Sequence, residues 1–561
     1  KNAVADVIVV GSGAAGFTAA VTARLMGLDV LLLEKAPVLG GTTAISGGGI
    51  WCPCSPVAQR ENVPDSFEQA REYFAAVTGP NFDPERAEAF LRAAPEMISF
   101  LERKAGMSFF LAPDRPDYYD TVGTTVGARM ILPTDVDARK LRELIGFLRP
   151  PARETTFLGM MMRPASDLRH FLNVFRSFES FRFVVWRLLL LVRDRLFHGR
   201  SMELAGGNAL IAQLLLAGDK AGVRIHTSTP VLRLTTDGDR VTGVVCREGG
   251  QEIEVRAKRG VILAGGGFPQ DVARRKERYS HAPSGLEHLS PAPAENTGDG
   301  IRMAEEIGAA IPKLADAACW APVSEVPYSK NRFGVFPHLI DRQKPGFIAV
   351  TADGRRFTNE SHSYHEFGRG LRRAGAGKYP LYCFLIADHP TIRRYGMGFA
   401  KPSPVPLWPY LRSGYLIRGR TLAELAARAG IDPRGLEETV ARFNAAAREG
   451  RDPDFARGTT AYNRYLGDKY NKPNPCLAPV EQGPFYAVRI QMGELGTFEG
   501  VATDENANVL RDDGSAIPHL YAAGNDMSHV MGGHYLGGGS AIGPAMTFGY
   551  IAARHIAGSA E

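Results

Sequence analysis

The chain has 561 residues, of which 44% are hydrophobic and 22% charged, with 66 Lys and Arg against 60 Asp and Glu. These proportions predict a globular protein of roughly three or four domain-sized units and exclude a collagenous or disordered chain. The net charge of +6 is too small for this length to indicate a nucleic-acid-binding protein. The 62 glycines exceed the usual share of roughly 7% and gather in short runs, which indicates close backbone approach to a ligand.

The cysteines and the hydropathy pattern narrow the class further. Six cysteines are too sparse for a disulfide framework, and the close pair Cys52 and Cys54 lacks a second Cys or His pair to complete a zinc site. We therefore expect no metal site and a reducing, cytoplasmic setting. No run of 18 uncharged apolar residues predicts a membrane span, and we expect no signal peptide because the first strand pattern begins near Asp6.

The N-terminal segment has the pattern of a dinucleotide-binding unit. An apolar, β-branched run at residues 7–10 predicts a buried parallel strand, and an Ala- and Leu-rich stretch at 17–26 predicts a helix after a glycine-rich turn. A second strand is expected over 30–33, and it ends at Glu34. This order of strand, glycine turn, helix, strand and acid is typical of a Rossmann-type unit.

Each glycine of the turn has its own physical reason. Gly11 permits the tight turn, Gly13 lets the backbone approach a pyrophosphate, and Gly16 lets the helix pack on the strand. The N-terminus of the helix then offers N–H groups and a positive dipole to the phosphates. Glu34 is placed to accept hydrogen bonds from the adenosine ribose hydroxyls.

A second glycine run, at 40–49, favours FAD, because a long cofactor needs backbone contacts at both its pyrophosphate and its isoalloxazine. The alternative for this run is a flexible surface loop. Two distant apolar runs, 260–267 and 520–525, also end in glycines, which is typical of segments that converge on one flavin. We expect non-covalent FAD. The expected FAD-binding residues are Gly11, Ser12, Gly13, Ala14, Ala15, Gly16, Glu34, Lys35, Gly41, Thr42, Thr43, Ser46, Gly47, Gly48, Gly49, Val231, Gly265, Gly266, Asn296, Asp299, Gly524, Asn525, Ser540 and Ile542.

Five further segments carry a resemblance to a known family. They are residues 47–53, 296–300, 355–361, 471–475 and 543–550. With these segments the chain resembles the 3-ketosteroid Δ1-dehydrogenases, which belong to the fumarate reductase and succinate dehydrogenase flavoprotein superfamily. The resemblance covers nearly the whole chain and is weakest between about Lys140 and Arg200.

The resemblance implies a reaction at ring A of a 3-oxosteroid. A proton leaves carbon 2 for a tyrosine base, and a hydride leaves carbon 1 for flavin N5. By this resemblance the hydroxyl of Tyr535 and the backbone N–H of Gly539 bind the 3-oxo oxygen, where they stabilise developing enolate charge. Bare glycine backbone suits a place where a carbonyl and a flavin crowd together.

The base implied by the resemblance is Tyr364. A phenol with a pKa near 10 is a poor base at pH 7, so a second group must assist it. The family uses another tyrosine, for which Tyr118 is favoured here over its neighbour Tyr119. Three histidines near these motifs receive no role from the resemblance: His362, His365 and His534. Trp320 matches a family aromatic near the steroid, and packing without substrate contact is the alternative.

The segments predict a discontinuous α/β protein. A Rossmann-like FAD-binding domain is expected from residues 1–135, 201–300 and 490–561, with an α+β substrate domain inserted at 301–489. Helices are expected there at about Thr421 to Ala429 and Pro433 to Glu449, because apolar residues recur at three- and four-residue steps. The remaining segment, 136–200, is expected to be a helical insert.

The insert is unusually apolar, aromatic and basic. Between residues 163 and 200 there are eight arginines against three acidic residues. This composition, over 141–200, predicts a helix that lies on a membrane surface with its apolar side in the headgroup boundary. Arg169, Arg176 and Arg187 are expected to share a face. The alternatives are capture of a sterol with a long apolar side chain, or a helical subdomain packed on the flavin domain with snorkelling arginines.

We therefore predict an FAD-dependent 3-oxosteroid 1-dehydrogenase of steroid degradation, cytoplasmic and peripheral on the inner face of the cell membrane. The insert favours a subtype for 3-oxo-Δ4 sterols such as cholest-4-en-3-one, with a quinone-like or similar electron acceptor. One alternative is a fumarate-type reductase or a dehydrogenase for another steroid bond, but the tyrosine loop lacks the cationic clamps of a fumarate site. The other is a catalytically silent sterol-binding flavoprotein, against which a candidate for every catalytic role argues.

Overall fold

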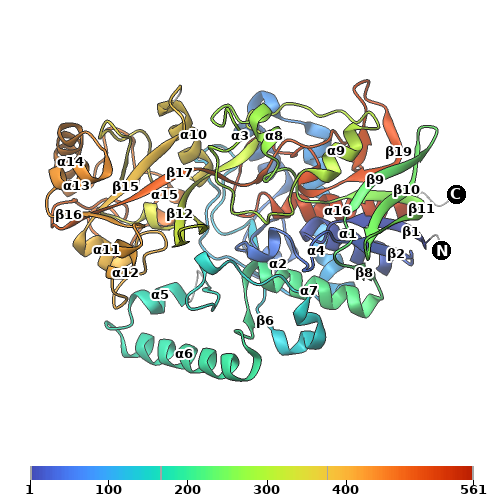
Figure 1. The fold of residues 1–561 in the computed structure, drawn as a ribbon, viewed down its shortest axis with the longest axis horizontal. Coiled ribbons are helices and arrows are strands. Elements are labelled where there is room, and N and C mark those ends of the chain that lie inside the picture. The colour runs from blue at the N-terminus through green and yellow to red at the C-terminus, as the bar shows by residue number, and fades with distance from the viewer. Residues whose placement is uncertain (1–2, 164–166, 376, 559–561) are drawn as a thin grey trace.

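The computed structural model describes residues 3–163, 167–375 and 377–558 and shows a mixed α/β protein built on two main sheets (Figure 1). Within this part of the chain the larger sheet has eight strands and a parallel centre, where β1 lies between β11 and β2. Its strands come from three separate stretches of sequence. They are, across the sheet, β18 (Asn508–Leu510), β19 (Ala516–Ala522), β11 (Gln251–Leu263), β1 (Ala3–Val10), β2 (Val30–Leu33) and β8 (Arg224–His226), with β10 (Arg240–Glu248) and β9 (Val231–Asp237) as an antiparallel extension of β11.

The first strands and helix lie where the sequence predicts them. The run at 7–10 is the second half of β1, the run at 30–33 is β2, and both are fully buried as a parallel centre requires. The helix starts at Ala14, three residues earlier than predicted, because the end of the glycine turn is already helical. The helices of this half are α1 (Ala14–Leu25), α2 (Pro56–Arg60), α3 (Phe67–Thr78), α4 (Pro84–Ala105), α7 (Gly206–Ala221), α8 (Val272–Arg278), α9 (Asp299–Glu305) and α16 (Ile542–Gly558).

The last helix, α16, packs tightly along α1 and returns the C-terminal segment to the first glycine turn. The close approach depends on Gly549, where a Cβ atom would lie 2.4 Å from the carbonyl oxygen of Ala15. The specific motif at 543–550 is therefore a helix-packing surface beside the cofactor turn.

The second sheet is antiparallel and lies at the other end of the molecule (Figure 1). β17 is its centre and runs unbroken past residue 489, so the predicted domain boundary at that position falls inside a strand. The strands are β12 (Ala318–Ser329), β13 (Arg332–Pro337), β14 (Phe347–Val350), β15 (Tyr382–Asp388), β16 (Ile417–Gly419) and β17 (Phe485–Thr497). The helices around it are α10 (Tyr364–Ala374), α11 (His389–Tyr395), α12 (Trp408–Arg412), α13 (Leu422–Ala429), α14 (Pro433–Arg448) and α15 (Ala461–Tyr465).

Alternation along the strands gives the second sheet two buried faces. Phe347 and Ala349 of β14 join the main core that is continuous with the FAD-binding half, whereas Ile348 and Val350 join a smaller core under α13 and α14. These two helices match the predicted ones within a residue, and Gly430 ends α13 in a left-handed conformation. The sheet is thus held rigidly from both sides, which fixes the loops at its inner edge.

The insert is set off from both halves (Figure 1). It contains α5 (Asp167–Leu172) and the long helix α6 (Phe178–His198), which pack on each other. Its ends are joined by a short antiparallel pair, β6 (Val136–Asp137) and β7 (Glu203–Leu204), and a separate small sheet consists of β3 (Ile50–Trp51), β4 (Phe109–Leu111) and β5 (Met130–Pro133). Short 3₁₀ turns complete the fold: η1 (Thr43–Ile45), η2 (Gly79–Asn81), η3 (Ala138–Gly146), η4 (Arg153–Thr155), η5 (Asp341–Gln343) and η6 (Gly524–Asp526).

Candidate active site

The first glycine turn has no room for side chains at Gly11 and Gly16. A Cβ atom at Gly11 would lie 2.3 Å from the carbonyl oxygen of Ala264, and one at Gly16 would lie 1.9 Å from the carbonyl oxygen of Gly11. A Cβ atom at Gly13, which precedes α1, would meet only Thr43 Oγ1, at a van der Waals distance of 3.8 Å. The turn is therefore tight on its inner side and open where the pyrophosphate of a dinucleotide would approach.

Glu34 secures this turn from the second strand. Its Oε2 accepts hydrogen bonds from the backbone N–H of Ser12 at 3.0 Å and from the Ser12 hydroxyl at 2.5 Å. Its Oε1 accepts from the N–H of Ala36 at 2.8 Å. Since each carboxylate oxygen has two lone pairs, acceptor capacity remains for a ribose hydroxyl. Val231 begins β9 two residues after Thr229, whose N–H donates to the Glu34 carbonyl at 2.8 Å.

The second glycine run and the distant segments converge on the same place. Asn296 Nδ2 donates to Thr42 Oγ1 at 3.1 Å and to the carbonyl oxygen of Gly266 at 3.3 Å. Lys35 Nζ forms an ion pair with Asp299 at 2.8 Å. A Cβ atom would meet nothing within 4 Å at Gly47, and one at Gly13 or Gly41 would make a single contact at 3.8 Å. The geometry fits an extended FAD along these backbones. Lys35 and Asp299, both predicted to bind FAD, form an ion pair with each other.

Asp526 is a buried carboxylate in this region that the sequence interpretation did not include. It accepts hydrogen bonds from the backbone N–H groups of Gly265 at 2.6 Å and Gly267 at 2.9 Å. Burial raises its pKa to about 6, and these two N–H groups act against that shift. It lies directly after Gly524 and Asn525, so an acid at the end of the glycine segment was the available signal.

Tyr118, Tyr364 and Tyr535, which come from three distant segments, meet in one buried cluster. The hydroxyl oxygens of Tyr118 and Tyr364 lie 3.4 Å apart, and the Tyr535 ring centroid lies 5.3 Å from that of Tyr364. Tyr119 points elsewhere and donates its hydroxyl to Glu366 Oε1 at 2.9 Å. Of the two adjacent tyrosines, Tyr118 is therefore the one that contacts Tyr364.

Local structure fixes each of these rings. Tyr364 is the first residue of α10, whose N-terminus is capped by the Ser363 side chain. The N–H of Tyr118 donates to the carbonyl of Leu536 at 2.9 Å, so the Tyr118 segment is tied to the loop that carries Tyr535. Tyr462 of α15 packs against Tyr118 with the two rings tilted and their centroids 4.4 Å apart, and it is a fourth phenol that sequence reasoning missed.

The glycine loop after Tyr535 packs closely against the backbone of Gly49 and Trp51, at the end of the second glycine run. Gly539 accepts a hydrogen bond from the N–H of Trp51 at 3.1 Å, and a Cβ atom at Gly539 would lie 2.5 Å from the same nitrogen. Among the described residues the N–H of Gly539 has no hydrogen-bond partner. Ser540 holds the loop through its hydroxyl, which accepts from the N–H of Gly537 at 2.9 Å. The N–H of Gly539, four residues after Tyr535 on the same loop, is thus an available donor.

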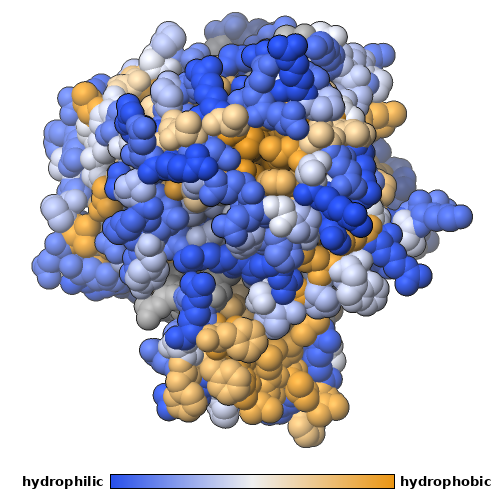
Figure 2. Space-filling model, turned by 90° about the vertical axis from the view of Figure 1, so that its left-hand side faces the viewer, coloured by the Kyte–Doolittle hydropathy of each residue, from blue (hydrophilic) through white to orange (hydrophobic). Residues whose placement is uncertain are grey.

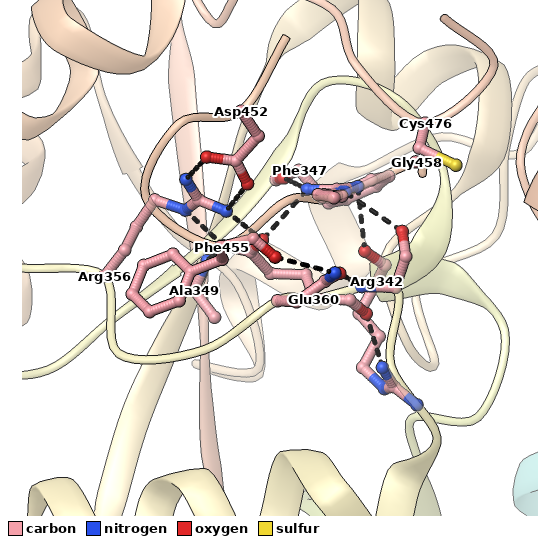
Figure 3. Close-up of polar contacts among 12 residues, drawn as sticks. Arg342, Phe347, Ala349, Arg356, Glu360, Asp452, Phe455, Gly458 and Cys476 are labelled. Atoms are coloured by element: carbon pink, nitrogen blue, oxygen red, sulfur yellow. Dashed lines mark hydrogen bonds and ion pairs between the residues drawn. The ribbon is translucent and has the colours of Figure 1, made fainter. Parts of the chain in front are cut away.

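An ion network anchors the segment that leads into Tyr364 (Figure 3). Arg356 pairs with Glu360 at 2.6 Å and with Asp452 at 2.8 Å, and Arg457 also pairs with Glu360 at 3.2 Å. These charges are almost wholly buried and bonded to one another, as buried ions must be. The specific motif at 355–361 is therefore a structural support for the Tyr364 helix rather than a set of substrate contacts.

The remaining sequence candidates have structural roles. Trp320 is fully buried, and its Nε1 donates to Asp316 Oδ1 at 2.6 Å. His365 is also buried and accepts a hydrogen bond from the Trp320 backbone N–H at 3.1 Å. Among the described residues, neither side chain forms a hydrogen bond with the hydroxyl of Tyr118, Tyr364 or Tyr535.

The insert carries an exposed apolar face (Figure 2). Along α6 these side chains recur every three or four residues, as on one side of a helix. They are Phe178, Phe181, Val185, Trp186, Leu189, Val192 and Leu196, each at least 39% exposed. Arg187 differs from the prediction that it shares an arginine face: it is buried and pairs with Asp167 at 3.0 Å and with Glu203. No helix in the described ranges is long and apolar enough to cross a bilayer.

Comparison with known proteins places the chain in context. The family model for the FAD binding domain matches residues 6–542. A 4-oxocyclohex-2-ene-1-carboxylate 5-dehydrogenase from Sinomonas cyclohexanicum is 41% identical, over 99% of this chain and 94% of that protein. A 3-oxosteroid 1-dehydrogenase from Mycobacterium tuberculosis is 40% identical, over 99% of this chain and 98% of that protein. The crystal structure of 3-ketosteroid Δ1-dehydrogenase from Sterolibacterium denitrificans with 1,4-androstadiene-3,17-dione superposes with a TM-score of 0.91 at 35% identity, covering 99% of this chain and 100% of that one.

Proposed function

This chain belongs to the FAD-binding flavoprotein family that contains the 3-oxosteroid 1-dehydrogenases, and we propose that it desaturates ring A of a 3-oxosteroid between carbons 1 and 2. The family, the α/β flavoprotein fold, the FAD cofactor and the oxidoreductase class that the sequence predicts are confirmed by these relatives. The observation that carries the proposed reaction is the meeting of Tyr118, Tyr364 and Tyr535 beside the free N–H of Gly539.

The chain's own residues supply binding and proton transfer. We assign the Tyr535 hydroxyl and the Gly539 N–H to the 3-oxo oxygen, because donors there stabilise the enolate that forms as carbon 2 loses its proton. Tyr364 takes that proton, and Tyr118, 3.4 Å from it, assists. Bound FAD supplies the acceptor for the hydride that leaves carbon 1. Burial of the three rings excludes water from this place.

A second candidate substrate class has a specific observation in its favour. The 41% identical relative is named for a monocyclic ketone that carries a carboxylate. A 3-oxosteroid ring A and such a cyclohexenone both present a ring ketone with hydrogens on the neighbouring carbons, so the same tyrosines and glycine serve either one. The two substrate classes differ in the rest of the substrate: a steroid carries further apolar rings, whereas the monocyclic ketone carries a single carboxylate.

The function is tested by mixing the purified holoenzyme anaerobically with three ketones and following flavin absorbance. We expect bleaching by androst-4-ene-3,17-dione and by cholest-4-en-3-one, and slower or no bleaching by 4-oxocyclohex-2-ene-1-carboxylate. Faster bleaching by the carboxylate would assign the chain to the monocyclic class. A spectral shift without bleaching by any ketone would overturn the dehydrogenase proposal in favour of a silent binder.

We also propose that the exposed face of α6 rests on an anionic membrane surface, which would bring the enzyme to membrane-dissolved sterols and to a quinone-like electron acceptor. The support is that the apolar face of α6 is exposed in the described part of the chain and is flanked by the exposed arginines Arg176, Arg182 and Arg193. Such a face favours the headgroup boundary, and each Arg near anionic lipid adds roughly 1 kcal/mol.

Vesicle sedimentation tests this membrane position. The holoenzyme should bind vesicles that contain phosphatidylglycerol much better than vesicles of phosphatidylcholine alone, and salt should weaken the binding. Binding to neither, together with a dimer in analytical ultracentrifugation, would mean that a second copy covers the face instead.

A further inference from the structure

Two parts of the proposed site come from distant segments and must be held at a fixed distance from each other. Tyr535 and Gly539 lie on one loop and are assigned to the 3-oxo oxygen, whereas Tyr118 and Tyr364 are assigned to the proton at carbon 2. A misplacement of about 1 Å between such groups costs roughly 100-fold in rate. The contacts that join the loop to the Tyr118 segment therefore matter for catalysis as well as for stability.

The hydroxyl of Tyr73 bridges these two parts. Tyr73 lies on α3 and is fully buried. Its hydroxyl donates to the backbone carbonyl of Leu536, directly after Tyr535, at 2.6 Å, and accepts from the backbone N–H of Tyr119 at 3.3 Å. The same Leu536 carbonyl also accepts from the N–H of Tyr118 at 2.9 Å. One phenol and one carbonyl thus join the two segments.

The surroundings of Tyr73 hold its ring and keep its hydroxyl protonated. A Cβ atom at Gly123 would lie 2.6 Å from the backbone nitrogen of Tyr73, so the loop around Gly123 packs closely on α3. The ring centroid lies 6.4 Å from that of Trp51 and 5.4 Å from the guanidinium carbon of Arg129. Burial raises the pKa of Tyr73 well above its usual range, and the Asp117 carboxylate adds to the shift. The hydroxyl therefore remains a hydrogen-bond donor.

Trp51 makes a second bridge from the same buried region. Its backbone N–H donates to the carbonyl of Gly539 at 3.1 Å, and its Nε1 donates to Asp117 Oδ1 at 2.9 Å. A Cβ atom at Gly537 would lie 2.8 Å from that Nε1 and 3.1 Å from the same carboxylate oxygen. Arg129 fixes Asp117 through an ion pair at 2.8 Å. The region of Tyr73 and Trp51 thus contacts both parts of the site.

A second buried tyrosine offers a matched comparison. Tyr279 is fully buried, like Tyr73, but its hydroxyl has no hydrogen-bond partner within the residues that the structure describes. Its ring contributes packing alone, against Phe268 and Trp320. Loss of the hydroxyl therefore tests bridging at Tyr73 and only packing at Tyr279.

We propose that Tyr73 is a positioning residue, whose hydroxyl sets the distance between the loop that binds the 3-oxo oxygen and the tyrosines that take the carbon-2 proton. The inference rests on the proposed dehydrogenation, in which Tyr73 itself neither takes nor gives a proton. Without the hydroxyl, the N–H of Tyr119 loses its acceptor and Leu536 loses one of two donors. The loop keeps its internal bond from the N–H of Gly537 to Ser540 Oγ at 2.9 Å, so it still binds the ketone.

The first test is stopped-flow reduction of the flavin over a range of androst-4-ene-3,17-dione concentrations. In Tyr73→Phe the rate at saturating steroid should fall about 10- to 100-fold, while the Kd of the steroid stays within about threefold of wild type. Tyr279→Phe should change neither quantity. Replacing Tyr73 with 4-aminophenylalanine, which restores a donor, should recover most of the rate.

Isotopic substitution shows which bond the loss affects. Deuterium at carbon 2 should slow Tyr73→Phe by a larger factor than it slows wild type, because the base is then misplaced. Deuterium at carbon 1 should not. A Tyr73→Phe rate equal to that of wild type, with Tm alone lowered, would make Tyr73 a structural residue and overturn the proposal. A rate loss matched by an equal loss of steroid affinity would also overturn it, since the loop itself would then be distorted.

Hydrogen exchange of the holoenzyme provides a readout without turnover. Residues 117–119 and 535–540 should exchange faster in Tyr73→Phe than in Tyr279→Phe, because the bridge between them is lost. Equal exchange in the two variants would contradict the bridging role. If no ketone reduces the wild type, the proposed function fails, and hydrogen exchange still decides whether Tyr73 joins the two segments.

Discussion

Two regions of this molecule combine aromatic rings with arginines, and they do so in opposite environments. In the tyrosine cluster the rings are buried and the guanidiniums of Arg115 and Arg342 have no carboxylate partner among the described residues. On α6 the rings are exposed, and Arg187, the arginine that turns inward, is paired with carboxylates.

The difference shows what each set of charges does. The guanidinium of Arg342 is held by the backbone carbonyls of His338, Glu360 and His362, so the cations of the cluster lie among neutral groups. Exposed arginines beside apolar rings need no such partner, because water or lipid headgroups solvate them. Residue type therefore does not assign function in either region; the surroundings of the charge do.

The largest expected effect is on flavin reduction, from a substitution in the buried tyrosine cluster. Tyr364→Phe removes the proposed base while keeping the ring, so flavin reduction by steroid should fall about 100- to 10,000-fold, the usual contribution of general base catalysis. Bound flavin, measured by its absorbance ratio to protein, should stay at one per chain. Tyr119→Phe is the matched control, because that hydroxyl bonds Glu366 and not Tyr364. A Tyr364→Phe rate within a few-fold of wild type would contradict the role of Tyr364.

The next largest effect is expected from a substitution that weakens the attachment of α6 to the rest of the protein. Arg187→Met removes the cation that pairs with both Asp167 and Glu203, and loss of one partner of a buried pair costs about 3–5 kcal/mol. The insert should open locally, so limited proteolysis should cut within 141–200 while the flavin-binding half stays intact. Arg182→Met, at an exposed position on the same helix, is the control and should not increase cutting. Equal proteolysis of both variants would mean that this pair does not hold the insert.

How far the sequence predicts each region follows from the range of the contacts. The βαβ unit is predicted almost to the residue, because its strands and glycine turn interact within the first 34 residues and each position has one physical requirement. The resemblance supplied Tyr118, Tyr364 and Tyr535, whose convergence depends on segments more than 400 residues apart. No local pattern contains that information.

The sequence does not reveal the remaining residues for a related reason. Tyr462 and Arg342 lie in ordinary surroundings in the sequence and acquire their importance from the packing of α15 and η5 against Tyr118. Helical angles alone predict that Arg187 shares an arginine face, but angles do not say which side of a helix meets the protein. Periodicity predicts that faces exist, and tertiary contacts decide which one is buried.

Asp526 sharpens the comparison, because it is a buried carboxylate held by backbone N–H groups instead of a cation. Its pKa is raised to about 6 in the folded protein from an ordinary value of 3.8. The folded state therefore binds this proton more tightly, and the stabilisation present at low pH is lost as pH rises through about 6. The upper limit is about 3 kcal/mol.

The measurement is the Tm of the holoenzyme between pH 5 and pH 7.5. Relative to Asp526→Asn, which cannot ionise, wild type should lose stability as pH rises over this window. Asp513→Asn, at an exposed turn, should follow the wild-type curve. Parallel curves for wild type and Asp526→Asn would show that this carboxylate does not titrate in the folded protein.

The smallest expected effect is on the exposed face itself. Leu189→Glu places a charge at the centre of the α6 face, and loss of one inserted Leu weakens vesicle binding by about 2 kcal/mol, or roughly 30-fold. Reduction of flavin by androst-4-ene-3,17-dione in the absence of vesicles should not change, because Leu189 lies on the insert and outside the tyrosine cluster. Leu286→Glu, at an exposed Leu outside the insert, is the control and should bind vesicles like wild type. If both variants bind equally well, lipid does not contact this face, and the contrast between the two aromatic regions is one of burial alone.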